Sequence, residues 1–256
     1  MNTIEVGFFS MTSGAASGDD AAYLRWHLLD HLPEQYSIPG IRLGTRWRVD
    51  EECVARRIAA SDDLAPVRHV VSYLVGAPVD EMLRDFARLG RRLAEEGRYP
   101  EPATPHLLGA FERRGAYAAP TAQVSAGAVP FRPHRGVYLV VERPEAEAPL
   151  DAWWQWHHEE HVPALLATDG VAGVYPFRSS PRLGEGPDQG SHFGTTAPWD
   201  PGGRAITLVY LDGDVAATSS RLEPLVPQRW RDGVVHPQLA GPFRSPVTYE
   251  AWPAGS

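Results

Sequence analysis

One pattern of residues occurs twice in this chain, at a spacing of 130 positions and without a gap. The first copy reads Trp-His-x-x-Asp-His-x-Pro from Trp26, and the second reads Trp-His-x-x-Glu-His-x-Pro from Trp156. The same shift pairs further residues: Gly40 with Gly170, Trp47 with Phe177, and Arg48 with Arg178. A chain that repeats a pattern over this length is constrained to build one structural unit twice.

Hydrophobic periodicity and turn residues predict the same order of elements in both halves. In the first half we expect strands at 3–10, 41–49, 67–75 and 107–117, and helices at 21–32 and between an Asp80 cap and Gly97. In the second half we expect strands at 136–142, 171–178, 206–211 and 246–252, and helices from an Asp151 cap to 166 and at 216–225. Each half therefore reads β-α-β-β-α-β, the ferredoxin-like order.

This order predicts an α+β protein made of two tandem ferredoxin-like units. We place the first unit at 1–118, a linker rich in Ala, Pro and Gly at 119–134, and the second unit at 135–256 with a long loop at 179–204. A single ferredoxin-like sheet leaves one apolar face uncovered, so two units in one chain can pack these faces together. The expected result is an intrachain pseudo-dimeric α+β barrel with its helices outside.

Composition excludes several functions and locations. The net charge is −8 with no long basic run, which excludes nucleic acid and anionic membranes as partners. No apolar stretch approaches the length of a membrane span, and the first residues lack the features of a signal peptide. Cys53 is the only cysteine, so an intrachain disulfide is impossible. We expect a cytoplasmic protein, and a fused pseudo-dimer of this kind could still form a homodimer.

The repeated histidines fall on one stripe of the first helix in each half. The stripe holds positions at i, i+1, i+4, i+5 and i+8, which are Tyr23, Leu24, His27, Leu28 and His31, and Trp153, Trp154, His157, His158 and His161. Most of these residues are apolar or aromatic, so we expect the stripe to face the sheet. Asp30 and Glu160 rotate away from it.

Three interpretations of the histidine pairs remain open. They can be structural residues whose nitrogens are hydrogen-bonded inside the protein. They can bind a metal ion, because histidines at i and i+4 share a helix face, although the zincin motif requires Glu where this chain has Leu28 and His158. They can also transfer protons, because imidazole titrates near neutral pH.

The repeated pattern, followed by Gly40 or Gly170 and a strand, resembles EthD-like proteins of the dimeric α+β barrel superfamily. The resemblance is sharpest over the first helix and second strand of each half. It implies a ferredoxin-like fold with a cavity between helix and sheet. Members of the superfamily include cofactor-free monooxygenases, polyketide cyclases, dehydratases, decarboxylases, isomerases and haem-handling proteins, so the fold does not select the reaction.

We expect an enzyme that acts without an organic cofactor or metal on a small hydrophobic substrate, aromatic or polyketide-like, by dehydration, cyclisation or isomerisation. His27 and His157 would be the general acid/base groups, oriented by His31 and His161. The alternatives are a cofactor-free monooxygenase, a haem-binding protein, and a non-catalytic small-ligand stress module.

Further residues are candidates for substrate binding: Tyr23, Trp47, Arg48, Trp153, Phe177, Arg178 and His192. Arg48 and Arg178 either hold an anionic group of the substrate or pair with Asp30 and Glu160, and we favour the ion pairs. His192, in the long loop, either closes over a cleft or lies on the surface.

Overall fold

The first half of the chain folds in the β-α-β-β-α-β order that its sequence predicts. The computed structural model describes residues 3–14, 20–99, 104–179 and 203–247. The elements of the first half are β1 (Val6–Thr12), α1 (Asp20–Trp26), the π-helical turn η1 (His27–His31), α2 (Leu32–Tyr36), β2 (Ile41–Arg48), α3 (Glu51–Ala55), β3 (Ala59–Ala60), β4 (His69–Val75), α4 (Val79–Glu95) and β5 (Pro105–Arg113).

The second half follows the same order. After β6 (Tyr117–Ala118) and the short 3₁₀ turns η2 (Pro120–Ala122) and η3 (Ala126–Phe131) come β7 (Gly136–Pro144), α5 (Leu150–Trp156), the π-helical turn η4 (His157–His161), α6 (Val162–Leu166), β8 (Val171–Ser179), β9 (Ala205–Leu211), α8 (Val215–Leu222), η6 (Val226–Trp230) and β10 (Val235–Arg244). None of the helices in the described residues has the length and apolar character needed to cross a membrane.

The closing strand differs from the prediction. It is β10, at 235–244, whereas the sequence pattern favours 246–252, of which 248–252 lie outside the described residues. Two prolines and a glycine interrupt the β10 sequence and hide its strand pattern. The register of β10 against β7 shifts between Pro237 and Leu239, and this bulge accommodates the first of the prolines.

The caps also differ in part from the prediction. The N-cap positions of α4 and α5 are Pro78 and Pro149, and the expected caps Asp80 and Asp151 lie within the first helical turn. There their carboxylates still interact favourably with the positive end of the helix dipole. Gly97 follows α4 with a φ of 68°, the left-handed conformation expected after a helix end.

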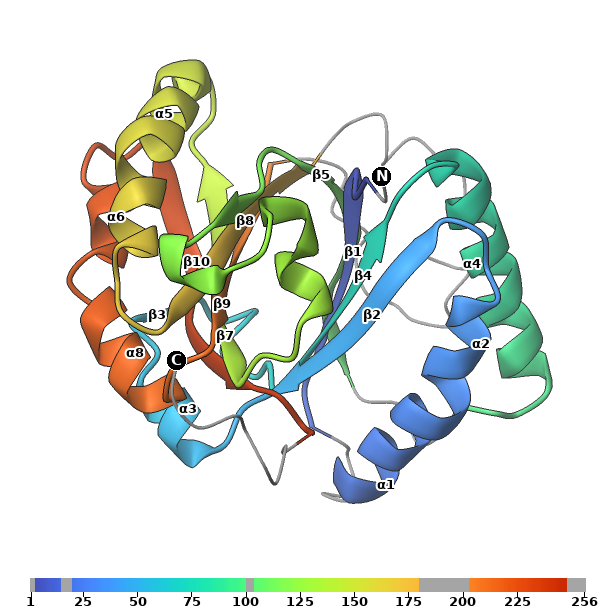
Figure 1. The fold of residues 1–256 in the computed structure, drawn as a ribbon. Coiled ribbons are helices and arrows are strands. Elements are labelled where there is room, and N and C mark those ends of the chain that lie inside the picture. Colours follow the sequence, from blue (N-terminus) through green and yellow to red (C-terminus); the bar gives the residue numbers. More distant parts are fainter. Residues whose placement is uncertain (1–2, 15–19, 100–103, 180–202, 248–256) are drawn as a thin grey trace.

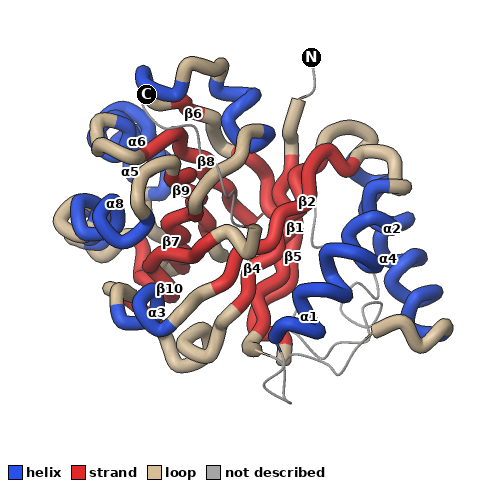
Figure 2. The backbone as a smooth tube through the Cα atoms, turned by 60° about the horizontal axis from the view of Figure 1, so that its bottom comes forward, coloured by secondary structure: helices blue, strands red, loops and turns tan. Residues whose placement is uncertain are grey.

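Eight strands form a closed antiparallel barrel. The order β2-β4-β1-β5 in one half and β8-β9-β7-β10 in the other is the strand order of a ferredoxin-like unit. Pairing of β5 with β8 and of β2 with β10 joins the two sheets into a ring. Helices α1, α2 and α4 cover one side of the barrel, and α5, α6 and α8 cover the other (Figures 1 and 2). The expected α+β barrel is confirmed.

The interior of the barrel is a packed apolar core. Alternate residues of each strand point inward, as in Phe9 of β1, which contacts Phe111 and Phe177 with ring centroids 5.7 and 5.2 Å apart. Trp47 of β2 and Tyr210 of β9 meet in the same cluster. The opposite faces of the strands pack under the helices in two separate clusters. Functional side chains between helix and sheet are therefore screened from the barrel interior.

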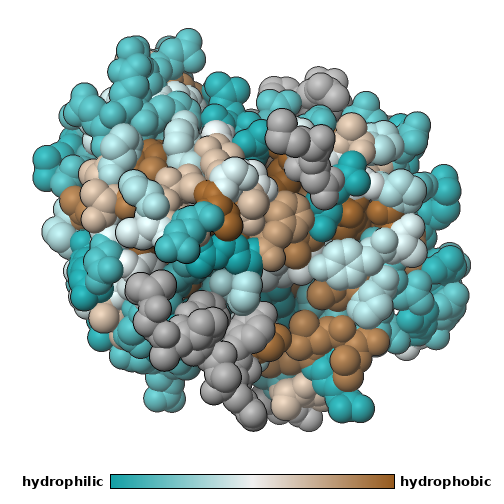
Figure 3. All heavy atoms as spheres, viewed as in Figure 1, coloured by the Kyte–Doolittle hydropathy of each residue, from teal (hydrophilic) through white to brown (hydrophobic). Residues whose placement is uncertain are grey.

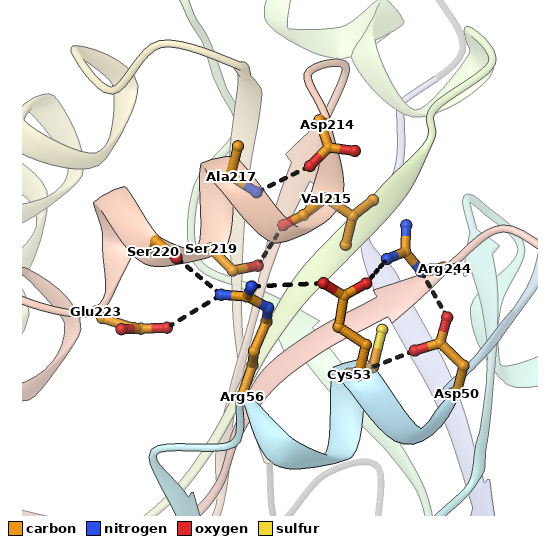
Figure 4. Close-up of polar contacts among 11 residues, drawn as sticks. Asp50, Cys53, Arg56, Asp214, Val215, Ala217, Ser219, Ser220, Glu223 and Arg244 are labelled. Carbon is orange, nitrogen blue, oxygen red and sulfur yellow. Dashed lines mark hydrogen bonds and ion pairs between the residues drawn. The ribbon is translucent and has the colours of Figure 1, made fainter.

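A polar seam joins the halves where β2 meets β10 (Figure 4). Asp50 accepts a hydrogen bond of 2.8 Å from the backbone N–H of Cys53 and caps α3. Arg244 of β10 forms ion pairs with Asp50 at 2.8 Å and with Glu52 at 2.6 Å. Arg56 donates to the hydroxyl of Ser220 on α8 at 2.8 Å. The single cysteine is thus buried in a structural seam, where burial raises the pKa of its thiol to about 11.

Candidate functional site

The repeated histidines lie on two π-helical turns, one in each half. In η1 the N–H of Leu32 donates to the carbonyl of His27, five residues back, and η4 repeats this bond between Val162 and His157. Pro33 and Pro163 lie two residues after the last residue of each turn. In a regular α-helix the ring of each proline would clash with the carbonyl four residues earlier. A π turn widens the helix by one residue at this point. Such turns occur frequently at functional sites.

His27 and His31 are buried between the first helix and the sheet. They are 2% and 9% exposed, and their ring centroids lie 5.7 Å apart. The Tyr73 hydroxyl of β4 lies 3.4 Å from His27 Nε2, and the Gln35 amide nitrogen lies 3.2 Å from His31 Nε2. The Nδ1 atoms of both histidines have no hydrogen-bond partner among the described residues. Each imidazole is therefore hydrogen-bonded at one nitrogen, while its other nitrogen is buried without a partner among the described residues.

Aromatic rings surround this pair. Trp26 stacks on His31 with centroids 4.7 Å apart, and Tyr99 contacts both rings at 5.4 and 5.5 Å. Tyr23 stacks on the other side of Trp26 at 5.7 Å. The first helical segment also presents hydrophobic side chains at the surface in the view of Figure 3, and Leu29 is 67% exposed. The chemical environment of the histidines is apolar and aromatic.

The sheet side of this site carries a buried cation. Arg46 and Trp47 are adjacent on β2 and point to opposite faces, so Trp47 enters the barrel interior while Arg46 faces the helix. The Arg46 guanidinium is 2% exposed and lies 4.4 Å above the ring of Tyr23. Its Nε and Nη1 atoms have no hydrogen-bond partner among the described residues. Nearby, His69 of β4 lies 3.3 Å from a carboxylate oxygen of Asp20.

Burial keeps both histidines of the first half neutral. Desolvation and then the charge of Arg46 hold the pKa of His27 well below its usual value, and the same two causes lower the pKa of His31 to about 4. Burial likewise raises the pKa of Tyr99 to about 12 and that of Tyr73 further. At neutral pH the site therefore holds two uncharged imidazoles, two neutral phenols and one guanidinium cation.

The second half places His157 and His161 in the corresponding position. His157 is fully buried and stacks on Trp153 with centroids 5.1 Å apart and planes at 10°. Trp156 stacks on His161 at 5.1 Å. Desolvation and then the charge of Arg229 hold the pKa of His157 well below normal and lower that of His161 to about 3. These imidazoles are also neutral, and no described residue hydrogen-bonds to any of their nitrogens.

The arginine of the second half has a counter-charge. Arg229 of η6 pairs with Glu142 of β7 at 2.6 Å and donates to Thr207 at 3.1 Å. The indole N–H of Trp230 also donates to Glu142 at 2.6 Å, and the guanidinium lies 5.4 Å from the Trp153 ring. This buried ion pair and its partners fill the space between helix and sheet beside His157.

Comparison with known proteins identifies the fold. Neither a protein-family model nor a curated protein sequence matches the chain. A solved structure of a candidate chlorite dismutase superposes with a TM-score of 0.55 over 94% of this chain and 95% of that one, at 11% identity. The two share the dimeric α+β barrel fold.

Two further solved structures give weaker superpositions. A candidate monooxygenase from Lactobacillus acidophilus gives a TM-score of 0.47 at 8% identity over 95% of this chain and 97% of that one. One from Fusobacterium nucleatum gives 0.48 at 9% identity over 96% and 94%.

The structure separates the predicted site residues into two groups. Trp153 stacks on His157, as the helical stripe indicates, and Tyr23 contacts His69 of β4 and stacks on Trp26. Trp47 and Phe177 lie on the other face of the sheet, within the barrel core, because they alternate with the helix-facing residues of β2 and β8. They belong to the core. His192 lies outside the described residues.

The expected pairing of Arg48 with Asp30 is not formed. Asp30 instead lies 3.1 Å from Arg98, which also binds Glu34 at 2.8 Å on the outer face of the helix. Arg48 ends β2 at the surface, opposite Arg244. In the second half Arg178 faces Glu112 across the β5–β8 junction, and no ion pair with Glu160 occurs in the described part of the chain. No contact of Arg48 or Arg178 with the repeated histidines occurs among the described residues, although Arg48 is the register partner of His69.

Sequence reasoning missed the residues that the sheet contributes: Arg46, His69 and Tyr73. None of them belongs to the repeated pattern, so the search for repeats passes over them. One signal was present, since strict alternation from Trp47 places Arg46 on the opposite face of β2 from the core.

The described residues give no metal site, and no contact among them indicates a haem. No group of three or more His, Cys, Asp or Glu side chains in the described ranges is arranged to hold a metal ion. A haem would have to lie against a histidine between helix and sheet. In the second half Trp153 and Arg229 fill that space, and in the first half the Tyr73 hydroxyl faces Nε2 of His27.

Proposed function

We propose that the protein is an enzyme that moves protons on a small, largely apolar and aromatic or polyketide-like substrate, without an organic cofactor. The reaction class is dehydration, cyclisation or isomerisation. His27 and His157 act as the general acid/base groups of their halves, and His31 and His161 orient them or the substrate. The observation that carries this proposal is the pair of buried, neutral imidazoles in an aromatic wall.

The geometry supports proton transfer because the nitrogens are available. Nδ1 of His27 has no partner among the described residues, while Tyr73 fixes the ring through Nε2. A ring hydrogen-bonded at one nitrogen and without a partner at the other is suited to accept a proton from a carbon acid and return it elsewhere. The lowered pKa of His27 keeps its imidazole unprotonated at neutral pH and also makes it a weaker base, so proton transfer depends on stabilisation of the charge that forms on the substrate.

Hydrogen–deuterium exchange tests this function without knowledge of the natural substrate. We expect the protein in D₂O to accelerate exchange of the acidic C–H of an aromatic ketone such as 2-tetralone or anthrone, measured by NMR. His27→Gln and His157→Gln, assayed singly, identify the working half, since at least one of them should lose most of the acceleration.

His236→Gln is the matched control, because His236 is exposed and its ion pair within the described residues is the one with Glu145 at 2.8 Å. It should exchange at the wild-type rate. The proposal fails if the wild-type protein does not accelerate exchange of any carbon acid, or if both buried-histidine variants keep full activity.

A further inference from the structure

The two halves differ at three sheet positions on the face that packs under the helices. In the first half Arg46 of β2 pairs with Val71 of β4. At the equivalent position of the second half, Pro176 of β8 pairs with Thr207 of β9. The same registers give the corresponding positions: Arg46 with Pro176, His69 with Ala205, and Tyr73 with Val209. The first half thus has three polar side chains where the second half has three apolar ones.

The charges of the halves differ in the same way. The second half buries an arginine, but Glu142 cancels the charge of Arg229 at 2.6 Å. The first half buries Arg46 with no carboxylate within ion-pairing distance in the described residues, and with Nε and Nη1 unbonded. A buried charge without a partner is strongly unfavourable, and proteins keep one only where a ligand or another group completes it. Within the described ranges Arg46 is therefore a buried cation without a paired carboxylate, and the ring of Tyr23 lies 4.4 Å from its guanidinium.

We infer that the first half is the working site and that Arg46 binds an oxyanion of the substrate, such as an enolate, phenolate or carboxylate oxygen on an aromatic molecule. This inference rests on the proposed function and gives it a location and a substrate class. A guanidinium presents several donors in a plane, which suits an anionic oxygen in a water-poor site. The aromatic body of the substrate would lie against Trp26 and Tyr23.

Arg46 would also have a role in the proton transfer itself. When the carbon acid loses its proton to Nδ1 of His27, the electron pair of the C–H bond forms a carbon–carbon double bond, and the carbonyl oxygen takes the negative charge. Arg46 holds that oxygen, and the charge forming there compensates the imidazolium. Donors aimed at developing charge are the most effective groups in such sites. Reprotonation of the enolate by the same imidazole restores the neutral pair.

Binding of a stable anion tests the inference directly. We expect wild-type protein to bind 2-naphthoate at least tenfold more tightly than the neutral 2-naphthamide in isothermal titration calorimetry. Arg46→Met should abolish this preference and leave naphthamide binding in place. Since it removes an uncompensated buried charge, Arg46→Met should also raise the melting temperature of the ligand-free protein. Arg88→Met, on the exposed face of α4, removes the same charge from the surface and should change neither property.

The outcomes separate this inference from the proposed function. Wild-type protein that fails to bind naphthoate, or binds it no better than naphthamide, overturns the oxyanion site before any variant is made. Retention of the preference in Arg46→Met also overturns it. If naphthoate binds through Arg46 but no carbon acid exchanges, the anion site stands and the proton-transfer chemistry fails. If exchange depends on His27 but the protein binds naphthoate no better than naphthamide, the proton-transfer chemistry stands and the anion site fails.

Discussion

At the scale of single residues, the molecule contains two buried arginines in opposite states. Arg229 donates through Nη2 to Glu142 and Thr207 and forms an ion pair with Glu142, while no described carboxylate forms an ion pair with Arg46. Burial raises the pKa of Glu142, and the neighbouring charge of Arg229 opposes that rise. A buried ion pair adds little stability compared with apolar residues, but breaking one leaves the other charge stranded. The two arginines should therefore respond in opposite ways to loss of charge.

Glu142→Gln isolates this effect in the second half. The amide keeps the size of the side chain but removes the counter-charge of Arg229, so we expect a loss of about 3 kcal/mol in the free energy of unfolding. Urea denaturation measures it. Glu145→Gln is the control, because its pair with His236 is exposed and should be worth less than about 1 kcal/mol. Equal losses of unfolding free energy in the two variants would show that the buried ion pair contributes no more to stability than the exposed one.

At this scale the sequence predicted only the residues of the repeated pattern. The histidine stripe and its orientation toward the sheet followed from helical spacing alone. Arg46 could not be found in the same way, since its register equivalent is Pro176 and the repeat is broken there. Trp47 and Phe177 were candidates for substrate binding with core packing as the alternative, and alternation along the strands places both in the core.

At the scale of secondary-structure elements, the π turns decide how the histidines meet. A turn that bonds five residues back rotates His31 relative to His27 by less than a regular α-helix does. The prolines at 33 and 163 follow each turn and cannot donate the hydrogen bond that an α-helix needs at that position. We expect these prolines to fix the positions of the two imidazoles of each half relative to each other. The sequence predicted a helix here but not its widened turn, because hydrophobic periodicity does not distinguish one inserted residue.

Pro33→Ala tests this role of the proline. An alanine N–H can bond four residues back, so η1 should relax toward a regular α-helix and move His31 relative to His27. We expect the binding of 2-naphthoate to weaken several-fold, with a melting temperature equal to or above that of the wild type, because a helix-interior proline costs about 3 kcal/mol relative to alanine.

Pro163→Ala makes the same change in the second half and serves as its control. If the first half is the working site, this variant should bind naphthoate as the wild type does. Weakening of similar size in both variants would indicate that the effect is not confined to one half.

At the scale of the whole molecule, the two halves share one interior. Side chains from both sheets interdigitate in the same cluster, as Phe9 with Phe177 and Trp47 with Tyr210. The Arg244 and Arg56 contacts add a polar seam at the other junction. Element order and barrel closure followed from the sequence because both depend on apolar alternation. The position of β10 did not, since its prolines conceal that alternation.

This shared core makes acid stability a property of the whole molecule. In the folded protein the pKa values of His31 and His161 are about 4 and about 3, whereas an unfolded histidine titrates near 6.5. Between these values the unfolded state binds more protons than the folded state, so stability must fall as the pH drops below about 6.5. Each buried neutral histidine contributes a slope of about 1.4 kcal/mol per pH unit over its own window.

We therefore expect the free energy of unfolding to decline steeply from pH 6.5 to pH 4, in one transition seen alike by tryptophan fluorescence and far-UV circular dichroism. His31→Gln removes one of the titrating groups and should make the slope shallower by about 1.4 kcal/mol per pH unit. His236→Gln, at an exposed position, should leave the slope unchanged. A slope in His31→Gln equal to that of the wild type would mean that His31 is not held neutral by burial.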